Sequence, residues 1–271
     1  MKPQIRVITD KPLLRSYFNH DPALCGYALG DMEATMWQMT TYRGCFLDEN
    51  LVAVAVEWHG ANPPVLLLFG PEAFVASLLS AGDLPRTVFY MLPAEHLAVL
   101  QRYYEAPEYD LLWRMAVSPE TFRPPTKTIS GLRPLNGSDA ASWDQLFRRD
   151  PGGQVTMTTP TASRLASGVY FGIEEAGELV AVAGTHVSAP SEGIAAVGSV
   201  YTRPDKRGQG YATLTTAAVT ARFFEMGVKT VILNVLQENK PAIHVYKKLG
   251  YHIHAPIIEG PAKWRINTGT L

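Results

Sequence analysis

The sequence predicts an α/β protein in which two domains each build a mixed sheet covered by helices. The chain has 271 residues, more than one ordinary domain requires. Short apolar runs of strand length alternate with segments of helical periodicity, which is typical of a sheet with crossover helices. Hydrophobic residues make up 46% and charged residues 18% of the chain, so each domain can bury its own core.

A proline-rich segment at about 118–128 separates the two expected domains. It reads Ser-Pro-Glu-Thr-Phe-Arg-Pro-Pro-Thr-Lys-Thr, and its paired prolines are incompatible with a helix and disfavour a central strand. We therefore expect an N-terminal domain over residues 1–122 and a C-terminal domain over 128–271.

The two halves share an order of elements that indicates an ancient duplication. The run Leu-Val-Ala-Val-Ala occurs at 51–55 and again at 179–183, each time after an acidic turn. A later strand and helix at 87–104 correspond to a strand and helix at 230–248. The matching order of strand, helix and strand is stronger support for a duplication than the short sequence identities are.

Periodicity and end signals place the elements of the C-terminal half. Ser138 and Asp139 are expected to cap a helix that carries Trp143. Gly227 and Gly250 are expected to end two further helices. The expected strands span 129–135, 170–174, 178–187, 195–202 and 229–236, and the two later helices span 211–226 and about 241–248.

Each of the two later helices shows an apolar face at helical spacing. The first face is expected to contain Leu214, Ala217, Ala218, Ala221 and Phe224. The second is expected to contain Ala242, Val245, Tyr246 and Leu249.

Charge and cysteine content exclude several classes of function. The formal net charge is −1 without a long basic run, which argues against a nucleic-acid partner. Cys25 and Cys45 form no CxxC pair and have no histidine cluster beside them, so we expect neither a disulfide framework nor a metal site. No stretch of about 18 apolar residues occurs, so we expect no membrane partner and a cytoplasmic location.

The chemistry is predicted at the turn from Arg203 to Gly210, between a strand and a helix. Free amides at a helix N-terminus suit a pyrophosphate, and Arg203, Lys206 and Arg207 are expected to add positive charge around it. Two alternatives stay open on the glycines alone: a solvated surface turn, and a dinucleotide loop of the form Gly208-x-Gly210-x-x-Thr213. The dinucleotide loop fits less well, because its last glycine is missing and the turn follows several strands of its domain.

Two motifs at the proper separation give the C-terminal half its resemblance to a known family. The first, Arg/Gln-x-x-Gly-x-Gly/Ala, is matched by Arg207, Gly210 and Ala212. The second, an Asn followed by a helix and then Gly-Phe/Tyr, is matched by Asn239, Ala242, Tyr246, Gly250 and Tyr251. Over residues 128–271 the chain resembles the GCN5-related N-acetyltransferases, the GNAT family, and the fold class becomes tandem acyl-CoA N-acyltransferase-like domains.

The resemblance implies acetyl-CoA as co-substrate and a grip on it made largely by the backbone. Peptide groups of Val200 and Thr202, on either side of Tyr201, would pair with the pantetheine arm like an added strand. Asn239 would contact the arm, and Tyr246 would point its hydroxyl at the sulfur and protonate the leaving thiolate. The pyrophosphate would sit on the amides of Arg207, Gly208, Gln209, Gly210, Tyr211 and Ala212.

A general base is harder to identify, because the strand residues 198–201 offer no carboxylate. His186 and Glu192 are the candidates, with a water relay as a competitor, and the imidazole has the more suitable unperturbed pKa. His252 and His254 share one face of a strand, and without a carboxylate partner they are interpreted as surface or lining residues.

These residues predict an acyl-CoA-dependent N-acetyltransferase acting on a primary amine of a small molecule or peptide. The missing carboxylate leaves a non-catalytic acyl-CoA sensor as the alternative. A chain whose shorter half recruits a protein partner is a third interpretation. The N-terminal half lacks the first motif before residue 118, so we expect it to be a degenerate copy of the same fold.

Overall fold

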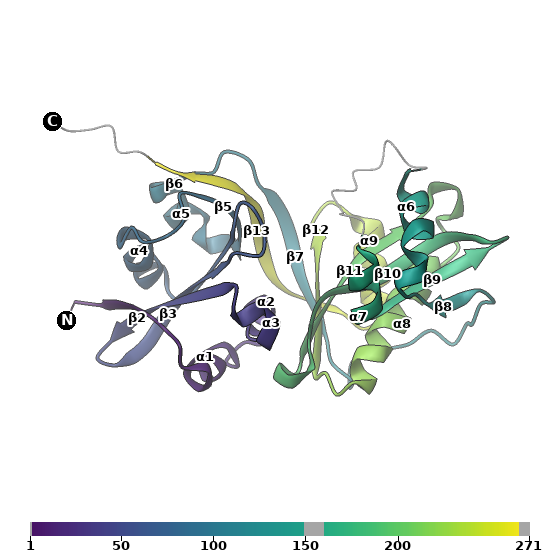
Figure 1. The fold of residues 1–271 in the computed structure, drawn as a ribbon, viewed down its shortest axis with the longest axis horizontal. Helices are drawn as coiled ribbons and strands as arrows, with labels where there is room; N and C mark the ends of the chain where they lie inside the picture. Colours follow the sequence, from purple (N-terminus) through teal and green to yellow (C-terminus); the bar gives the residue numbers. More distant parts are fainter. Residues whose placement is uncertain (1, 149–159, 266–271) are drawn as a thin grey trace. The chain divides into compact units, whose positions relative to one another are not determined.

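A computed structural model describes residues 2–148 and 160–265 (Figure 1). The chain divides into two compact units that do not follow the chain order. Unit 1 comprises Met1–Arg114, Asn234–Glu238 and His254–Leu271, and unit 2 comprises Met115–Leu233 and Asn239–Ile253. The proline-rich segment expected as a linker therefore lies inside unit 2.

Unit 1 is built on a sheet with the strand order β1-β2-β3-β4-β5-β13. Its strands are β1 (Gln4–Val7), β2 (Thr40–Leu47), β3 (Asn50–Trp58), β4 (Val65–Phe69), β5 (Thr87–Pro93), the short β6 (Tyr104–Glu105) and, near the end of the chain, β13 (His252–Trp264). Neighbours are antiparallel except β4 and β5, which are parallel. The last strand of the chain thus completes the sheet of the unit that contains the N-terminus.

Helices cover both faces of the unit 1 sheet, because its central strands are apolar throughout. In β3, Ala53 and Ala55 pack toward α4 and α5, while the alternating Val54 and Val56 are equally buried. On the second face, the ring of Phe18 in α1 contacts Phe69 of β4. The helices are α1 (Lys11–Phe18), α2 (Gly26–Gly30), α3 (Ala34–Trp37), α4 (Glu72–Ser80), the 3-10 turn η1 (Ala94–His96) and α5 (Leu97–Tyr103).

Unit 2 repeats this plan with the strand order β12-β11-β10-β9-β8. Its strands are β8 (Leu132–Pro134), β9 (Tyr170–Glu175), β10 (Glu178–Ala189), β11 (Ile194–Thr202) and β12 (Thr230–Leu236); β7 (Asp110–Val117), β12 and β13 carry residues of both units. As in unit 1, the strands are antiparallel except for one parallel pair, here β11 and β12. The shared sequence of hairpin, third strand, helix and parallel strand supports the predicted duplication.

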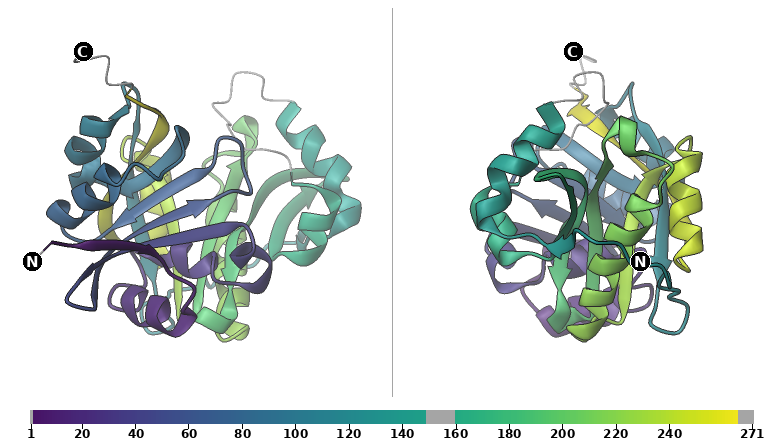
Figure 2. Two further views of the ribbon diagram at one scale, coloured as in Figure 1. Left: turned by 60° about the vertical axis from the view of Figure 1, so that its left-hand side comes forward. Right: turned by 90° about the vertical axis from the view of Figure 1, so that its right-hand side faces the viewer.

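The helices of unit 2 lie on opposite faces of its sheet (Figure 2). Trp143 of α6 and Leu165 of α7 pack with Tyr170 on one face, and Leu214 of α8 packs with Val180 on the other. The helices are α6 (Ala140–Arg148), α7 (Ala162–Ser167), α8 (Tyr211–Glu225) and α9 (Lys240–Lys248), with 3-10 turns η2 (Gly137–Asp139), η3 (Pro190–Glu192) and η4 (Pro204–Lys206).

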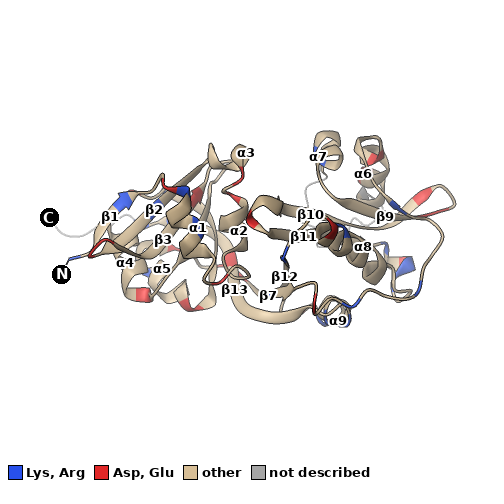
Figure 3. Ribbon diagram, turned by 90° about the horizontal axis from the view of Figure 1, so that it is seen from below, with Lys and Arg blue, Asp and Glu red and all other residues tan. Residues whose placement is uncertain are grey.

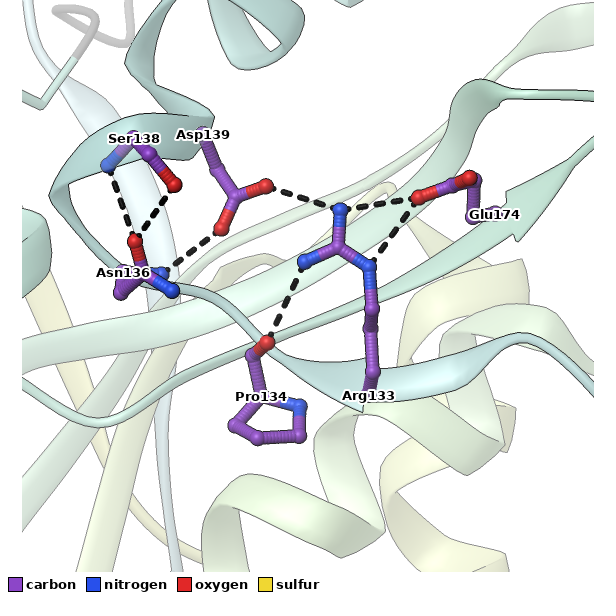
Figure 4. Close-up of polar contacts among 6 residues, drawn as sticks. All are labelled: Arg133, Pro134, Asn136, Ser138, Asp139 and Glu174. Carbon is purple, nitrogen blue, oxygen red and sulfur yellow. Dashed lines mark hydrogen bonds and ion pairs between the residues drawn. The ribbon is translucent and has the colours of Figure 1, made fainter.

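The start of α6 differs from the expected cap and is held by an ion-pair network (Figure 4). Asn136 is the N-cap, since its side chain accepts from the amide of Ser138 and Asp139 accepts from the Asn136 amide at 2.8 Å. The expected cap at Ser138 and Asp139 was therefore wrong by two residues. Arg133 of β8 joins Asp139 and Glu174 of β9, each at 2.8 Å, and so ties the helix start to the sheet.

The predicted apolar faces of α8 and α9 were each partly wrong. In α8 the buried aromatics are Tyr211 and Phe223, whereas Phe224 is half-buried and packs against the ring of Phe122. In α9 Tyr246 and Leu249 are buried as expected, but Ile243 is buried as well, and Ala242 and Val245 are half-buried. In α8 apolar residues occur on more than one side, so spacing alone does not select the buried face.

Candidate active site

Ser199 interrupts the regular pairing of β11 with β10. Gly198 and Tyr201 pair with residues on either side of Ala183, so Ala183 lies opposite two residues, Ser199 and Val200. Ser199 has φ of 53°, in the left-handed region that residues with a side chain rarely adopt. Such a bulge turns peptide groups out of the ladder, and strained backbone of this kind is typical of functional sites.

Beyond the bulge, β11 and β12 separate. Their parallel pairing joins Ile194–Ala196 with Thr230–Ile232, while β11 continues to Thr202 and β12 to Leu236 without further pairing to each other among the described residues. The edge of β11 that faces β12 therefore keeps unpaired backbone groups. An extended ligand can pair with such an edge as an added strand.

The turn after β11 presents a group of free amides at the start of α8. Gly208 and Gly210 have φ of 78° and 86°, and Gly210 occupies the N-cap position without a side-chain cap. The first intrahelical bond runs from the Leu214 amide to the Gly210 carbonyl at 3.1 Å, so the amides of Tyr211 and Ala212 have no acceptor in the helix. With the dipole of this 15-residue helix behind them, these amides are suited to an anion.

Two of the three positive side chains of the turn are paired with carboxylates. Lys206 lies 2.5 Å from Glu175, the last residue of β9, and the hydroxyl of Tyr211 donates to the same carboxylate. Arg203 pairs with Asp205 at 2.6 Å. Hydrogen bonds from Lys206 and then Tyr211 hold the pKa of Glu175 below its usual range. Acidic and basic positions are accordingly interspersed along this part of the chain (Figure 3).

At the end of β11 the site depends on backbone groups, as the contacts of Arg207, Thr202 and Tyr201 show. The Arg207 guanidinium donates to the carbonyl of Thr202 at 3.1 Å, which braces the turn against the end of β11. The side chain of Tyr201 is buried, with its ring 4.6 Å from that of Phe147. The side chain of Tyr201 therefore packs within unit 2 and is not presented to a ligand.

Asn239 and Tyr246 lie on α9, which follows β12. The side-chain oxygen of Asn239 accepts from the amide of Ala242 at 3.1 Å and caps the helix, so its amide nitrogen is the group left for a ligand. Parallel strands end at the same edge of a sheet, which puts Asn239 and the glycine turn after β11 at one edge. Tyr246 lies seven residues further along, about 10 Å back from that edge.

Tyr246 is held by packing and not by hydrogen bonds. Its side chain is 6% exposed, its ring lies 6.0 Å from that of Tyr251, and its hydroxyl has no hydrogen-bond partner in the described part of the chain. The Tyr251 hydroxyl is 2.7 Å from that of Thr220 in α8. Burial raises the pKa of Tyr246, so this hydroxyl keeps its proton at neutral pH.

His186 lies beside the β11 bulge. It is the extra residue of a second bulge, because Thr185 pairs with Val197 and Val187 pairs with Ala196. A β-carbon added to Gly198 would lie 2.9 Å from the β-carbon of His186 and 3.4 Å from its Nδ1. The glycine therefore makes room for the exposed imidazole one residue before Ser199. Sequence reasoning could not find the Ser199 bulge, since serine gives no signal for positive φ.

His254 has a carboxylate partner, contrary to the expectation for the pair at 252 and 254. Its Nε2 lies 2.8 Å and 2.9 Å from the two carboxylate oxygens of Asp21, 233 positions away in the sequence. Cys25 and Cys45 are buried free thiols, and burial raises the pKa of Cys25 to about 12. Within residues 2–148 and 160–265, no group of three or more His, Cys, Asp or Glu side chains could hold a metal. None of the helices in these residues has the length and hydrophobicity of a membrane-spanning helix.

Comparison with known protein families supports the resemblance that the two motifs indicated for the C-terminal half. Residues 139–251 match the model of the acetyltransferase (GNAT) family. The C-terminal half carries a GNAT domain. No curated protein sequence matches this chain significantly.

Solved structures of the same fold extend over both halves of the chain. A Drosophila protein is 15% identical with a TM-score of 0.71, covering 97% of this chain and 99% of that chain. A GCN5-related N-acetyltransferase from Sphaerobacter thermophilus is 17% identical with a TM-score of 0.57, covering 97% and 95%. A tandem GNAT protein from the clavulanic acid biosynthesis pathway is 12% identical with a TM-score of 0.55, covering 97% and 98%. The fold is therefore that of a tandem GNAT protein, with a GNAT-like N-terminal half.

Proposed function

We propose that unit 2 transfers an acetyl group from acetyl-CoA to a primary amine of a small molecule or peptide. The observation that carries the proposal is the continuous backbone track in the GNAT domain, which runs from the bulge at Ser199 along the free edge of β11 to the glycine turn before α8. The track combines unpaired strand groups with an anion site. Those two features match the amide-rich arm and the pyrophosphate of one ligand.

Acetyl-CoA would lie along this track with its pyrophosphate on the amides between Arg207 and Ala212. Peptide groups of Val200 and Thr202 would pair with the pantetheine amides, and the Asn239 amide nitrogen would donate to the arm. Since Lys206 and Arg203 are held by carboxylates, the backbone and the helix dipole would supply most of the attraction for the phosphates. The acetyl group would then lie near the β11 bulge.

The reaction joins the amine nitrogen to the acetyl carbon and breaks the carbon–sulfur bond. The amine must be neutral to attack, and His186, beside the bulge, would accept its proton. An amide freed from the ladder by the bulge would stabilise the oxyanion of the tetrahedral intermediate. The neutral Tyr246 hydroxyl would donate a proton to the departing thiolate.

Coenzyme A release from acetyl-CoA, measured with purified full chain against a panel of primary amines and peptides, tests the proposal. Gln209 provides a matched pair of variants, because its side chain is exposed between the two glycines of the turn. Gln209→Glu should raise KM for acetyl-CoA several-fold by adding a negative charge at the phosphate site, whereas Gln209→Lys should not. Turnover on any amine supports the enzyme.

The same assay addresses the second candidate function, a non-catalytic acyl-CoA sensor. This candidate is favoured by the absence of a carboxylate from residues 198–201 of β11. Acetyl-CoA binding that responds to the Gln209 variants, without turnover on any amine, would support the sensor function and reject the enzyme function. Absence of acetyl-CoA binding would reject both.

A further inference from the structure

Unit 1 contains a cavity of 580 Å³ at the place that corresponds to the acyl-CoA track of unit 2. Here too the two strands are parallel, and their pairing joins Val65 with Phe89 and Leu66 with Tyr90. The cavity is lined by Phe69 and Gly70 at the end of β4 and by residues that follow β5. Its volume is sufficient for a small organic molecule.

The mouth of this cavity lacks what a phosphate ligand requires. Gly70 leads through Pro71 directly into α4, and proline has no amide hydrogen to donate. Glu72, in the first turn of that helix, places a carboxylate at the end where a bound anion would lie and is paired with Arg102 at 2.7 Å. The described residues that line the cavity include neither lysine nor arginine. These features disfavour coenzyme A and other anions.

The polar groups of the lining are mainly hydrogen-bond acceptors. His96 is 2% exposed; its Nε2 lies 2.9 Å from the Gly70 carbonyl and so carries the hydrogen of that bond. In the neutral imidazole Nδ1 is an acceptor, and this atom is buried and without a hydrogen-bond partner among the residues that the structure describes. Glu95, 80% exposed, adds a carboxylate to the lining; the carboxylate of Asp21 also lies there but is paired with His254.

The remaining walls are apolar and aromatic, formed by side chains such as Phe69 and Tyr17. An aromatic wall suits an organic cation as well as an apolar group. We propose that the cavity of unit 1 binds a small primary amine with an apolar body, its ammonium donating to the acceptors around His96 and Glu95. The proposal concerns unit 1 alone and stands whether or not unit 2 transfers acetyl groups.

Three probes of one shape but different charge test this inference: phenethylammonium, 2-phenylethanol and 3-phenylpropanoate. Each is titrated into the ¹⁵N-labelled full chain, and the amide signals of Val52, Gly70 and His96 report on the cavity. The expected order of affinity is ammonium, then alcohol, then carboxylate. Binding of the carboxylate as tight as the ammonium, or ammonium-induced shifts that avoid these three amides, would overturn the proposal.

Glu95→Gln removes one acceptor charge at an exposed position and so leaves the fold intact. It should weaken phenethylammonium about two- to five-fold, the range for an exposed charge pair, and leave 2-phenylethanol unchanged. Glu108→Gln, an exposed glutamate outside the cavity lining, should change neither. Val52→Phe, which fills the cavity, should abolish binding of both probes while the circular dichroism spectrum stays native. Unaltered binding in Val52→Phe would exclude the cavity as the site.

Discussion

Replacing Gly250 with alanine should destabilise unit 2 far more than the same change at Gly227. Both glycines end a helix in the left-handed region, with φ of 91° after α9 and 85° after α8. A β-carbon at Gly227 meets nothing within 4 Å, whereas at Gly250 it would lie far inside contact distance of the Thr121 carbonyl oxygen. The two variants therefore share the backbone strain and differ only in the clash.

The expected magnitudes follow from these two contributions. Left-handed strain alone gives about 1–2 kcal/mol for Gly227→Ala. At Gly250 the displacement of the segment at Thr121 adds about 1–3 kcal/mol. The same displacement threatens the hydrogen bond from the Arg123 amide to the Leu249 carbonyl, 3.0 Å long, which contributes about 1 kcal/mol. Gly250→Ala should therefore lose about 3–6 kcal/mol in total.

Urea unfolding followed by far-ultraviolet circular dichroism measures both variants against the unaltered chain. The midpoint should fall modestly for Gly227→Ala and severely for Gly250→Ala. Equal losses in the two variants would refute the reasoning, because they would mean that the segment around Thr121 does not pack on the end of α9.

Three further predictions concern the site and its support. Glu175→Gln should raise the affinity for acetyl-CoA several-fold by calorimetry, because it releases Lys206 and removes a carboxylate from the turn; lower affinity would contradict this. Tyr246→Phe should lower turnover several-fold at unchanged acetyl-CoA affinity, and unchanged turnover with chemistry rate-limiting would remove its role as proton donor. Hydrogen bonding to Arg133 lowers the pKa of Asp139 in the folded chain. The ion pair therefore stabilises the fold at neutral pH, and this contribution is lost as the pH falls through the lowered pKa. Asp139→Asn should thus cost about 1–2 kcal/mol in urea unfolding at neutral pH and much less in acid, and a loss independent of pH would exclude the ion pair as its cause.

Local patterns in the sequence predicted the strands and helices of the C-terminal half because each depends on neighbouring residues. Gly227 and Gly250 end their helices as expected, and the strand at 195–202 differs from β11 by one residue. The membership of the two units was beyond local patterns, because β13 pairs with β5 across a separation in sequence that no spacing rule reports.

In the site too, some features follow from neighbouring residues and others depend on residues distant in the sequence. The glycine turn was visible because positive φ favours glycine, whereas the positive φ of Ser199 is imposed by the strand beside it. The pairing of Lys206 with Glu175 and of His254 with Asp21 joins residues from separate elements, so the pattern of charges along the chain does not indicate which cations are neutralised. The cavity of unit 1 likewise gathers residues from several elements between 17 and 96.

The central claim is that acetyl-CoA binds along the backbone of β11 and the turn before α8. A titration of the ¹⁵N-labelled full chain with acetyl-CoA tests it most directly. The account predicts that the amide signals of Gly208, Gly210 and Val200 shift most and saturate together. Shifts confined to unit 1, for example at Gly70, or no shift at all, would contradict it.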